Sequence, residues 1–448
     1  MRILATSAPG ASFPAIGPAE APGARRSARA GRGAVDVLAW LGVLLLFGLS
    51  GYALEYFGIP YVSVGGSILT KLHPATYVFT LALALAVIAN PDPAGYLASL
   101  VARRLGAIAL LAACTVIYVF ISRYKPDMTA AYLVDAMMSA AIVMLVLADS
   151  PPRARLWLAR LMHALVVANA LLAIVEVATH WRLFPFGVAG GYFTWDYRAT
   201  ALFGHPLDGA LATGVYAVIL MTAPRVPGLA ERLRLPVVLL CMAAMPAIGA
   251  RTSFVIVYLV AGVMAGFGLL SFLRGRANAS HMALLAVLAG AALLPLAALA
   301  AYDLGYLDGF LGRFQNDSGS ADSRFDLYNL FSRYGLAEML TGYSLIELKT
   351  RIRVEGLESG VENAWVGHLL QFGIPLAVML WCALAAFLAD LIRVAGRHAV
   401  APTIFMLLII STSVGISGKT TMLVMPVTIM LILLGRPDTA VRPPLSPS

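Results

Sequence analysis

The chain has 448 residues, of which 60% are hydrophobic and 12% charged, with a mean hydropathy of +0.83 and a net charge of +9. A soluble protein of this length could not bury so much apolar surface, so the composition excludes a soluble globular enzyme and predicts an integral membrane protein. The excess of positive charge does not predict a nucleic-acid partner, because the arginines mostly lie in short loops between apolar runs, where membrane topology places them.

In chain order, residues 1–34 are rich in Ala, Pro, Gly and Arg and contain no apolar core, so they predict a disordered basic tail in the cytoplasm rather than a signal peptide. Apolar runs of about 16–25 residues follow, the length that a helix needs to cross a bilayer. The expected spans are 35–57, 74–90, 104–122, 131–149, 161–179, 207–223, 235–250, 252–273, 282–301, 364–388, 399–417 and 420–435.

Charge predicts the orientation of these spans. With a cytoplasmic N-terminus, every inside connection is basic and nearly free of acids, as the positive-inside rule requires. The bases concerned are Arg103 and Arg104, Arg153, Arg155 and Arg160, Arg225, Arg232 and Arg234, Arg274 and Arg276, Arg393 and Arg397, and Arg436 and Arg442. We therefore expect an all-α membrane protein of about twelve spans: 1–9 in residues 35–301, 10–12 in residues 363–436, and a cytoplasmic tail at 437–448.

One connection, residues 302–362, is too long and too polar to be a simple turn, and it faces outward in this topology. Within it, the apolar spacing of residues 322–340 predicts an amphipathic helix on the membrane surface, with Asp322 or Ser323 as its N-cap. The Gly/Asp/Ser-rich stretch 312–321 is expected to be mobile. If the cell is a Gram-negative bacterium, this loop lies in the periplasm. There, any synthesis needs an activated substrate already carried on the membrane.

Three arginines on the expected outer face are candidate phosphate ligands. Arg198 precedes the sixth span, Arg251 lies in the turn between two spans, and Arg324 begins the amphipathic helix. Guanidinium groups hold phosphates in a bidentate geometry that lysine does not offer, so several of them would suit a diphosphate on a membrane lipid. The alternative is that each arginine anchors a span end among the lipid headgroups.

Candidate acid–base residues lie at the same face. His205 precedes Pro206 at a span start and could donate to a phosphate or accept a proton, or simply form a turn. Glu362 and Asn363 close the long loop, where a carboxylate could receive the proton of an attacking sugar hydroxyl, or begin a helix in the ordinary way. His368 lies about one turn further into that helix and could equally be a packing residue.

Other polar residues support different interpretations. Asp135, Glu176 and Asp208 lie in or beside spans, as the proton relays of a transporter do, but they could equally be paired structural acids. Residues 415–422 resemble a phosphate loop but lack its first glycine, so we expect no nucleotide there. Cys114, Cys241 and Cys382 lie in apolar runs without metal-ligand spacing and should be buried small hydrophobes.

The order of several short motifs carries a resemblance to a family. They are Arg-x-x-x-Leu-Phe-Gly-His-Pro at 198–206, Gly-x-Arg-Thr at 249–252, Leu-Thr-Gly-Tyr at 340–343 and Glu-Asn-Ala-Trp at 362–365. Over residues 35–436 the chain resembles the O-antigen ligase and polymerase superfamily of bacterial polysaccharide assembly. That resemblance implies a GT-C-like fold of membrane helices in the bacterial inner membrane. It also implies transfer of a glycan from undecaprenyl diphosphate at the periplasmic face, with neither nucleotide nor metal.

The resemblance also implies residue roles. Arg198 and Arg251 match arginines proposed to hold the diphosphate, and Arg324 matches the arginine of the loop helix. Ligases of the family typically carry His-Asn where this chain has Glu362-Asn363, which favours a polymerase of carrier-linked repeat units over a ligase. Glu362, with His205 as the alternative, would then be the general base.

A second departure is Leu207 after Pro206, where many members have Asn, and it has no assigned meaning. Donor and acceptor would both be undecaprenyl-diphosphate-linked glycans within the membrane lipid, and a flippase and a chain-length regulator are the usual partners. A glycan ligase remains the alternative within the family. A polysaccharide transporter or lipid-linked-oligosaccharide flippase remains the alternative outside it, although no internal repeat is evident and the arginines lie at the outer face rather than at mid-membrane.

Overall fold

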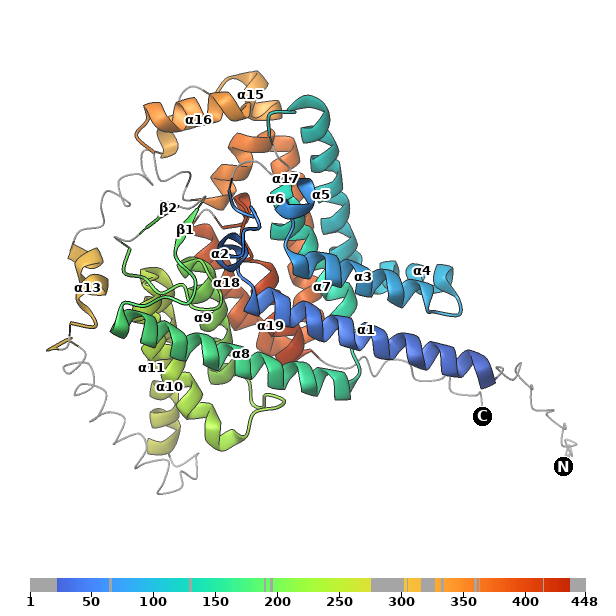
Figure 1. The fold of residues 1–448 in the computed structure, drawn as a ribbon, viewed down its shortest axis with the longest axis horizontal. Coiled ribbons are helices and arrows are strands. Elements are labelled where there is room, and N and C mark those ends of the chain that lie inside the picture. Colours follow the sequence, from blue (N-terminus) through green and yellow to red (C-terminus); the bar gives the residue numbers. More distant parts are fainter. Residues whose placement is uncertain are drawn as a thin grey trace, which may run out of the picture.

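The computed structural model describes residues 22–63, 67–128, 131–188, 191–193, 196–274, 302–303, 305–315, 327–331, 334–357, 361, 363–413 and 415–435 (Figure 1). These residues are nearly all helical, apart from an antiparallel pair of two-residue strands, β1 (Gly187–Val188) and β2 (Gly191–Tyr192). Four helices within the described ranges are long and apolar enough to cross a membrane: α5 (Leu105–Tyr124), α8 (Pro152–Thr179), α11 (Arg251–Leu273) and α17 (Ala364–Ala395). The chain is therefore a multi-pass membrane protein.

Shorter apolar helices accompany these four. They are α3 (Pro74–Ile88), α7 (Ser139–Leu147), α9 (Pro206–Thr222), α18 (Val400–Ser411) and α19 (Val424–Leu434). A π-helical turn at Val134–Met138 joins α7 to α6 (Ala131–Leu133). The other helices are α1 (Pro22–Gly48), α2 (Gly51–Tyr56), α4 (Pro93–Arg103), α10 (Glu231–Ile248), α13 (Asp308–Gln315), α15 (Leu336–Thr341) and α16 (Leu345–Val354), with single 3₁₀ turns at Ile68–Lys71, Leu327–Phe331, Arg397–Ala399 and Gly415–Ser417.

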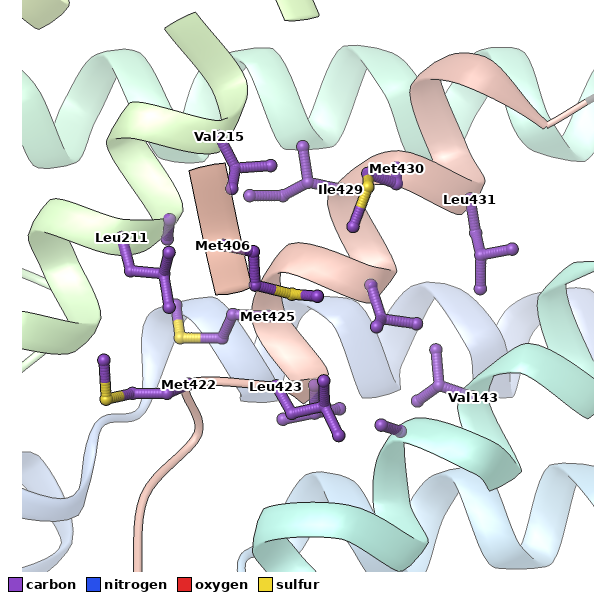
Figure 2. Packing of buried hydrophobic residues seen from close by; sticks show 14 of the residues in the cluster. Val143, Leu211, Val215, Met406, Met422, Leu423, Met425, Ile429, Met430 and Leu431 are labelled. Atoms are coloured by element: carbon purple, nitrogen blue, oxygen red, sulfur yellow. The ribbon is translucent and has the colours of Figure 1, made fainter. Parts of the chain in front are cut away.

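The shortest apolar helices form the centre of the bundle. Every residue of α19 from Val424 to Leu433 is buried, and α9 is buried over almost its whole length. Figure 2 shows their side chains packed together with Met406 of α18 and Val143 of α7. A helix that is apolar and buried on all sides belongs to the interior of a bundle, whereas α11, which is exposed over most of its length, lies at the edge.

Most expected spans correspond to a helix, but several boundaries were wrong. The first span is divided between α1 and α2, where the Ser50 hydroxyl caps α2. α8 begins at Pro152 rather than 161, and the expected spans 399–417 and 420–435 are the shorter α18 and α19, because residues 415–423 form a 3₁₀ turn and a loop. The sequence analysis did not predict α4. The expected span 282–301 lies outside the described residues.

Two further expectations need correction. The amphipathic helix expected over 322–340 is wrong where the structure describes it, because a 3₁₀ turn ends at Phe331 and α15 begins only after an extended Gly335. Its expected N-caps, Asp322 and Ser323, lie outside the described residues. Cys114 and Cys241 are buried as expected, but the expectation is wrong for Cys382, which is exposed on α17.

α5 and α17 pack side by side in opposite directions with a matched register. At one end the Gly106 N–H donates to Asp390 Oδ2 (2.5 Å), and at the other the Lys125 ammonium donates to the carbonyl of Gln371 (2.8 Å). The two helices therefore run together over equal lengths of chain. α17 pairs with α5 over the residues that follow Gly373. The first nine residues of α17 lie beyond the C-terminal end of α5, where Lys125 is located.

A break in α17 explains this division. Gly373 has φ +76° and ψ 171°, far from helical values. A Cβ on Gly373 would lie 2.5 Å from the carbonyl carbon of Leu340, and one on Gly342 would lie 2.5 Å from that of Gln371. The end of α15 thus crosses the break in α17 with backbone against backbone. This crossing holds α15 and α16, which we call the α15–α16 cap, over the end of the bundle (Figure 1).

Candidate functional site

The segment 415–423 joins the polar residues at one end of the bundle, the end that the topology predicts to face outward. Gln371 Nε2 donates to the carbonyl of Ser417 (3.1 Å). Further along, Thr421 Oγ1 donates to Asp208 Oδ2 (3.2 Å), and Lys419 Nζ donates to the carbonyl of Tyr61 (2.5 Å). This one segment therefore touches α17, α9 and the connection after α2. We call the residues around it, with the loop before α9, the polar layer.

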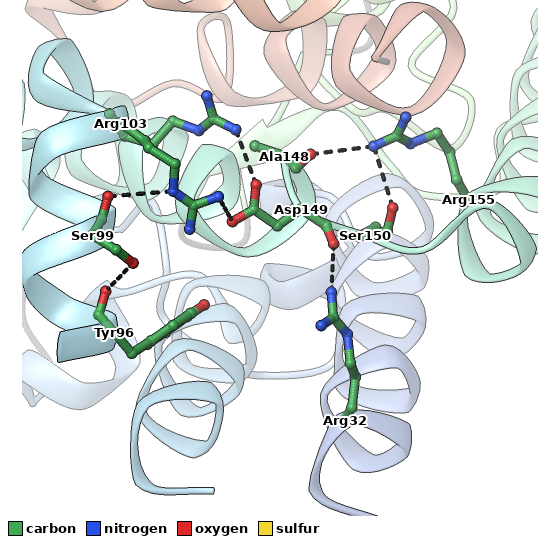
Figure 3. A network of polar contacts seen from close by, with 9 residues as sticks. Arg32, Tyr96, Ser99, Arg103, Ala148, Asp149, Ser150 and Arg155 are labelled. Carbon is green, nitrogen blue, oxygen red and sulfur yellow. Dashed lines mark hydrogen bonds and ion pairs between the residues drawn. The ribbon is translucent and has the colours of Figure 1, made fainter. Parts of the chain in front are cut away.

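Two helices that start from the opposite end of the bundle, α5 and α19, reach toward this layer over different lengths. At the opposite end of the bundle (Figure 3), Arg104 at the start of α5 contacts Asp149, and Arg155 contacts Ala148 and Gly435 at the end of α19, so the two helices share one level there. From that level α5 extends about 30 Å, but α19, with 11 residues, only about 16 Å. The polar layer therefore begins well short of the outer end of α5.

Arg198 lies in the polar layer, bound to an acid. Its Nε and Nη2 bind the carboxylate of Asp196, with Nε 2.9 Å from each oxygen, and its guanidinium carbon lies 5.8 Å from the centre of the Phe186 ring. Although burial alone would raise it, the bonds and charge of Arg198 hold the pKa of Asp196 below its usual range. The Asp196 carbonyl also accepts from Arg182, so two guanidinium groups flank this acid.

The turn that carries Arg251 lies directly against Arg198. Gly249 has φ +73°, and a Cβ there would lie 2.5 Å from Cγ of Arg198. Glycine is therefore required both by the conformation and by the contact. Arg251 follows as the first residue of α11 and is partly exposed. The structure thus brings these two predicted arginines to neighbouring positions, although they are 53 positions apart in the sequence.

Two polar residues of α8 hold the loop before α9. Glu176 accepts the backbone N–H groups of Leu183 (3.0 Å), Thr200 (2.9 Å) and Ala201 (3.0 Å), and Asn169 accepts those of Leu202 and Phe203 (both 3.1 Å). Ala201 has φ +43°, a left-handed conformation that costs about 1–2 kcal/mol without glycine. Such a conformation persists only where its surroundings enforce it. Glu176 is therefore a structural acid.

Replacing Glu176 by alanine should lower the free energy of unfolding by at least about 3 kcal/mol, because two buried N–H groups and one partly buried N–H group lose their acceptor. The loop at 183–204 should become sensitive to protease at the same time. Thermal unfolding in detergent and limited proteolysis would measure both. Glu231→Ala is the matched control, since the Glu231 side chain is 74% exposed and pairs with Arg234 on the surface of α10. Equal effects of the two substitutions would contradict this role.

His205 caps α9 and lies among aromatic rings. Its Nδ1 accepts the N–H of Leu207 (3.2 Å), and its ring stacks on Tyr52 at 6.3 Å and meets Phe186 edge-on at 5.8 Å. Burial, with the positive charge of Arg198, lowers the pKa of His205 to about 4. The ring is then neutral at pH 7 with its proton on Nε2. This arrangement suits a hydrogen-bond donor to an anion better than a general base.

Lys419 is a cation of this layer that the sequence analysis did not propose as a site residue. Its ammonium lies 3.6 Å from the centre of the Tyr61 ring, and burial lowers its pKa to about 8. Lys125 is a second such cation, donating to the carbonyls of Tyr343 and Gln371 at 2.8 Å each. The only sequence signal for Lys419 was the phosphate-loop-like stretch 415–422, and Lys125 had none.

Asp135 lies next to Tyr61, and both of its carboxyl oxygens accept hydrogen bonds. It accepts from the Tyr61 hydroxyl (2.9 Å), the Thr76 hydroxyl (2.8 Å) and the His73 N–H (2.9 and 3.1 Å). The cavity that it lines with Thr421 measures only about 10 Å³, room for at most one water molecule. Asp135 is thus a paired structural acid rather than a lone acid on a substrate path.

Of the remaining predicted site residues, two have structural roles and two lie outside the described residues. The Asn363 side chain caps α17 by accepting the N–H groups of Trp365 (3.0 Å) and Val366 (3.2 Å). His368 is buried and bonds the carbonyl of Ile416 (3.3 Å), a packing role. Arg324 and Glu362 lie outside the described residues.

The α15–α16 cap carries a separate open pocket of about 380 Å³. It is lined by Asn329, Leu330, Glu347, Thr350, Arg351, Val354 and Glu355. Arg351 is fixed there by Glu347 (2.9 Å) and by the Tyr343 ring, 4.6 Å from its guanidinium carbon. Its size and mixture of donors, acceptors and apolar atoms fall within the range of small-ligand sites.

Comparison of the chain with models of known protein families, with curated proteins and with solved structures found no match.

Proposed function

We propose that the protein is a membrane glycosyltransferase that polymerises glycan repeat units carried on a polyprenyl diphosphate. The observation that carries this proposal is that Arg182, Arg198 and the turn before Arg251 meet at the loop before α9. Lys419 lies in the segment whose Thr421 contacts Asp208 on the first turn of α9. Fixed cations close to the membrane suit a lipid-linked diphosphate, whose leaving charge they would stabilise. The supporting argument from sequence is the resemblance to the O-antigen ligase and polymerase superfamily.

In this proposal the chain's residues divide the work. Arg198 and Arg251 hold the diphosphate, and neutral His205 donates a hydrogen bond from Nε2 to one of its oxygens. Glu362 accepts the proton of the acceptor hydroxyl. The hydroxyl oxygen then bonds to the anomeric carbon as the bond to the diphosphate oxygen breaks, which inverts that carbon. The pocket of the α15–α16 cap offers polar groups to the sugars.

The test is polymer length in a strain that lacks this protein and is complemented with wild type, Arg198→Gln or Arg251→Gln, at protein levels matched by immunoblot. Each variant should reduce chain extension about 100-fold or more, the usual effect of removing one group that stabilises a developing charge. Arg225→Gln, exposed in the connection before α10, is the control and should restore long chains. Long polymer that is never attached to its lipid anchor would instead indicate a ligase, and repeats retained on the cytoplasmic side a flippase.

The rate of transfer should fall as pH rises through about 8, because Lys419 loses the charge that would bind the diphosphate. Above that pH the rate should drop about tenfold per unit. Lys419→Arg should abolish the fall, since arginine stays protonated. The titration of Lys419 does not itself destabilise the fold over this pH range. The lysine pKa is lowered from 10.5 on folding, so the unfolded chain binds more protons between pH 8 and 10.5 and stability rises there. Identical profiles for wild type and Lys419→Arg would contradict the assignment.

A further inference from the structure

The open pocket of the α15–α16 cap carries more negative than positive charge. Three of the residues that line it are charged: Glu347, Arg351 and Glu355. Two carboxylates against one guanidinium group leave one negative charge among the lining residues that the structure describes. Lys349 and Arg353 of the same helix are exposed and do not line the pocket, so solvent screens their effect on it.

Glu347 and Arg351 form a fixed pair at the pocket wall. Nε and Nη2 of Arg351 donate to Glu347 Oε1 at 3.2 and 2.9 Å, and the guanidinium carbon lies 4.6 Å from the centre of the Tyr343 ring. Within the described part of the chain, no bond occupies Nη1 of Arg351 or Oε2 of Glu347. The pair therefore presents one donor group and one acceptor atom to a ligand.

Glu355 has no partner of this kind. It is the C-cap residue of α16, and its backbone N–H donates to the Arg351 carbonyl (2.9 Å). Its carboxylate, partly buried, makes no hydrogen bond or ion pair with any residue that the structure describes. The C-terminal end of a helix favours a cation, so an acid at this position does not stabilise α16. A ligand in the pocket would give Glu355 the role that the helix does not.

Acceptors outnumber donors at the pocket wall. Both oxygens of Glu355 and one oxygen of Glu347 accept hydrogen bonds. The Thr350 hydroxyl donates its proton to a carbonyl of the preceding turn (2.8 Å), so it also presents an acceptor. The donor that remains is Nη1 of Arg351, and the Asn329 amide is donor and acceptor alike. A matching ligand brings several donors and a positive charge.

We propose that this pocket binds a sugar unit that carries a protonated amino group. The ammonium would donate to the Glu355 carboxylate, and the ring hydroxyls would bond the fixed pair of Glu347 and Arg351. Charge-assisted hydrogen bonds of this kind are about twice as strong as neutral ones. The choice of a sugar rests on the proposed function, whereas the positive charge of the ligand follows from the pocket itself.

The test measures binding of three disaccharides to the full chain in detergent by isothermal titration calorimetry. The disaccharide of glucosamine, its N-acetylated form and cellobiose share two linked rings and differ in the substituent next to the anomeric carbon. The glucosamine disaccharide should bind at least about tenfold more tightly than the other two, because it alone carries ammonium groups. Raising the pH until its amines are neutral should remove this advantage, and binding of cellobiose should stay unchanged.

Glu355→Gln should weaken binding of the glucosamine disaccharide about tenfold and should leave binding of cellobiose within about threefold of wild type. Glu338→Gln is the matched control, since Glu338 is an acid of α15 that does not line the pocket. It should bind the glucosamine disaccharide within about twofold of wild type. Equal losses in both variants would mean diffuse attraction to the whole cap and would overturn the assignment.

The pH series uses the unaltered protein, so it tests the proposal even if Glu355→Gln folds poorly. Equal binding of the three disaccharides would overturn the amino-sugar assignment and leave the proposed function untouched, and binding of none would overturn the pocket as a sugar site. If Arg198→Gln still extends the polymer normally while the glucosamine disaccharide binds with the expected preference, the proposed function fails and the assignment of this pocket stands.

Discussion

Gly342→Ala should lower the free energy of unfolding by about 2–6 kcal/mol and detach the α15–α16 cap from α17. Gly342 has φ +72° and ψ 172°, a region open almost only to glycine, which accounts for about 1–3 kcal/mol. The new Cβ would also lie 2.5 Å from the backbone of Gln371, and relieving such a contact costs about 1–3 kcal/mol more. Gly373→Ala should behave in the same way, because its contact with Leu340 is the reciprocal one.

Gly356→Ala separates the two causes. Gly356 has φ +69°, but no atom lies within 4 Å of the place where its Cβ would be. It should therefore cost only the conformational part, about 1–2 kcal/mol. Thermal unfolding in detergent gives the ranking, and hydrogen exchange over 336–354 shows whether the cap opens first. If Gly342→Ala costs no more than Gly356→Ala, the backbone crossing is not what holds the cap.

Lys125→Met should destabilise the same junction by about 3 kcal/mol or more. The Lys125 ammonium is almost fully buried and bonds the carbonyls of Tyr343, on the cap, and Gln371, just before the break in α17. Each charged hydrogen bond contributes about 1.5–3 kcal/mol, and methionine would leave both carbonyls without this donor.

Lys349→Met, an exposed lysine on α16, is the matched control and should change stability by less than about 0.5 kcal/mol. A double substitution of Lys125 and Gly342 should cost less than the sum of the single ones, because both act on one junction. Full additivity would mean that the ammonium and the glycine crossing stabilise different parts of the protein.

The sequence predicted those helices whose ends are marked by local capping residues or prolines. α9 begins where Pro206 follows His205, and α17 begins at the cap Asn363. Long apolar runs with arginines at one side likewise gave α5 and α11. In the polar layer, Arg198 contacts the turn before Arg251, and their role as phosphate ligands stays a prediction.

What the sequence could not predict depends on contacts between distant segments. The apolar run of α17 continues through Gly373 without a change of pattern, so its break becomes visible only where Leu340 crosses it. The expected spans took in residues 415–417 and 420–423, and only the bonds of this segment to Tyr61 and Asp208 show why the helices stop. The roles of Arg182 and Asp135 could not be predicted either. Both residues make their hydrogen bonds with residues that are distant in the sequence, so the residues next to them give no signal.

The order in which the chain is made has a consequence for this architecture. The bond from Lys419 to Tyr61 joins residues 358 positions apart, and the bond from Thr421 to Asp208 joins residues 213 apart. At about 5–20 residues per second, a ribosome needs roughly 20–70 s to complete the longer interval. During that time the early helices are already in the bilayer. After Asp208 has been made, its carboxyl group still has to wait for Thr421, 213 positions later. The nascent protein must therefore wait, partly open, for its last two helices, and a quality-control protease or a membrane chaperone has that interval in which to act on it.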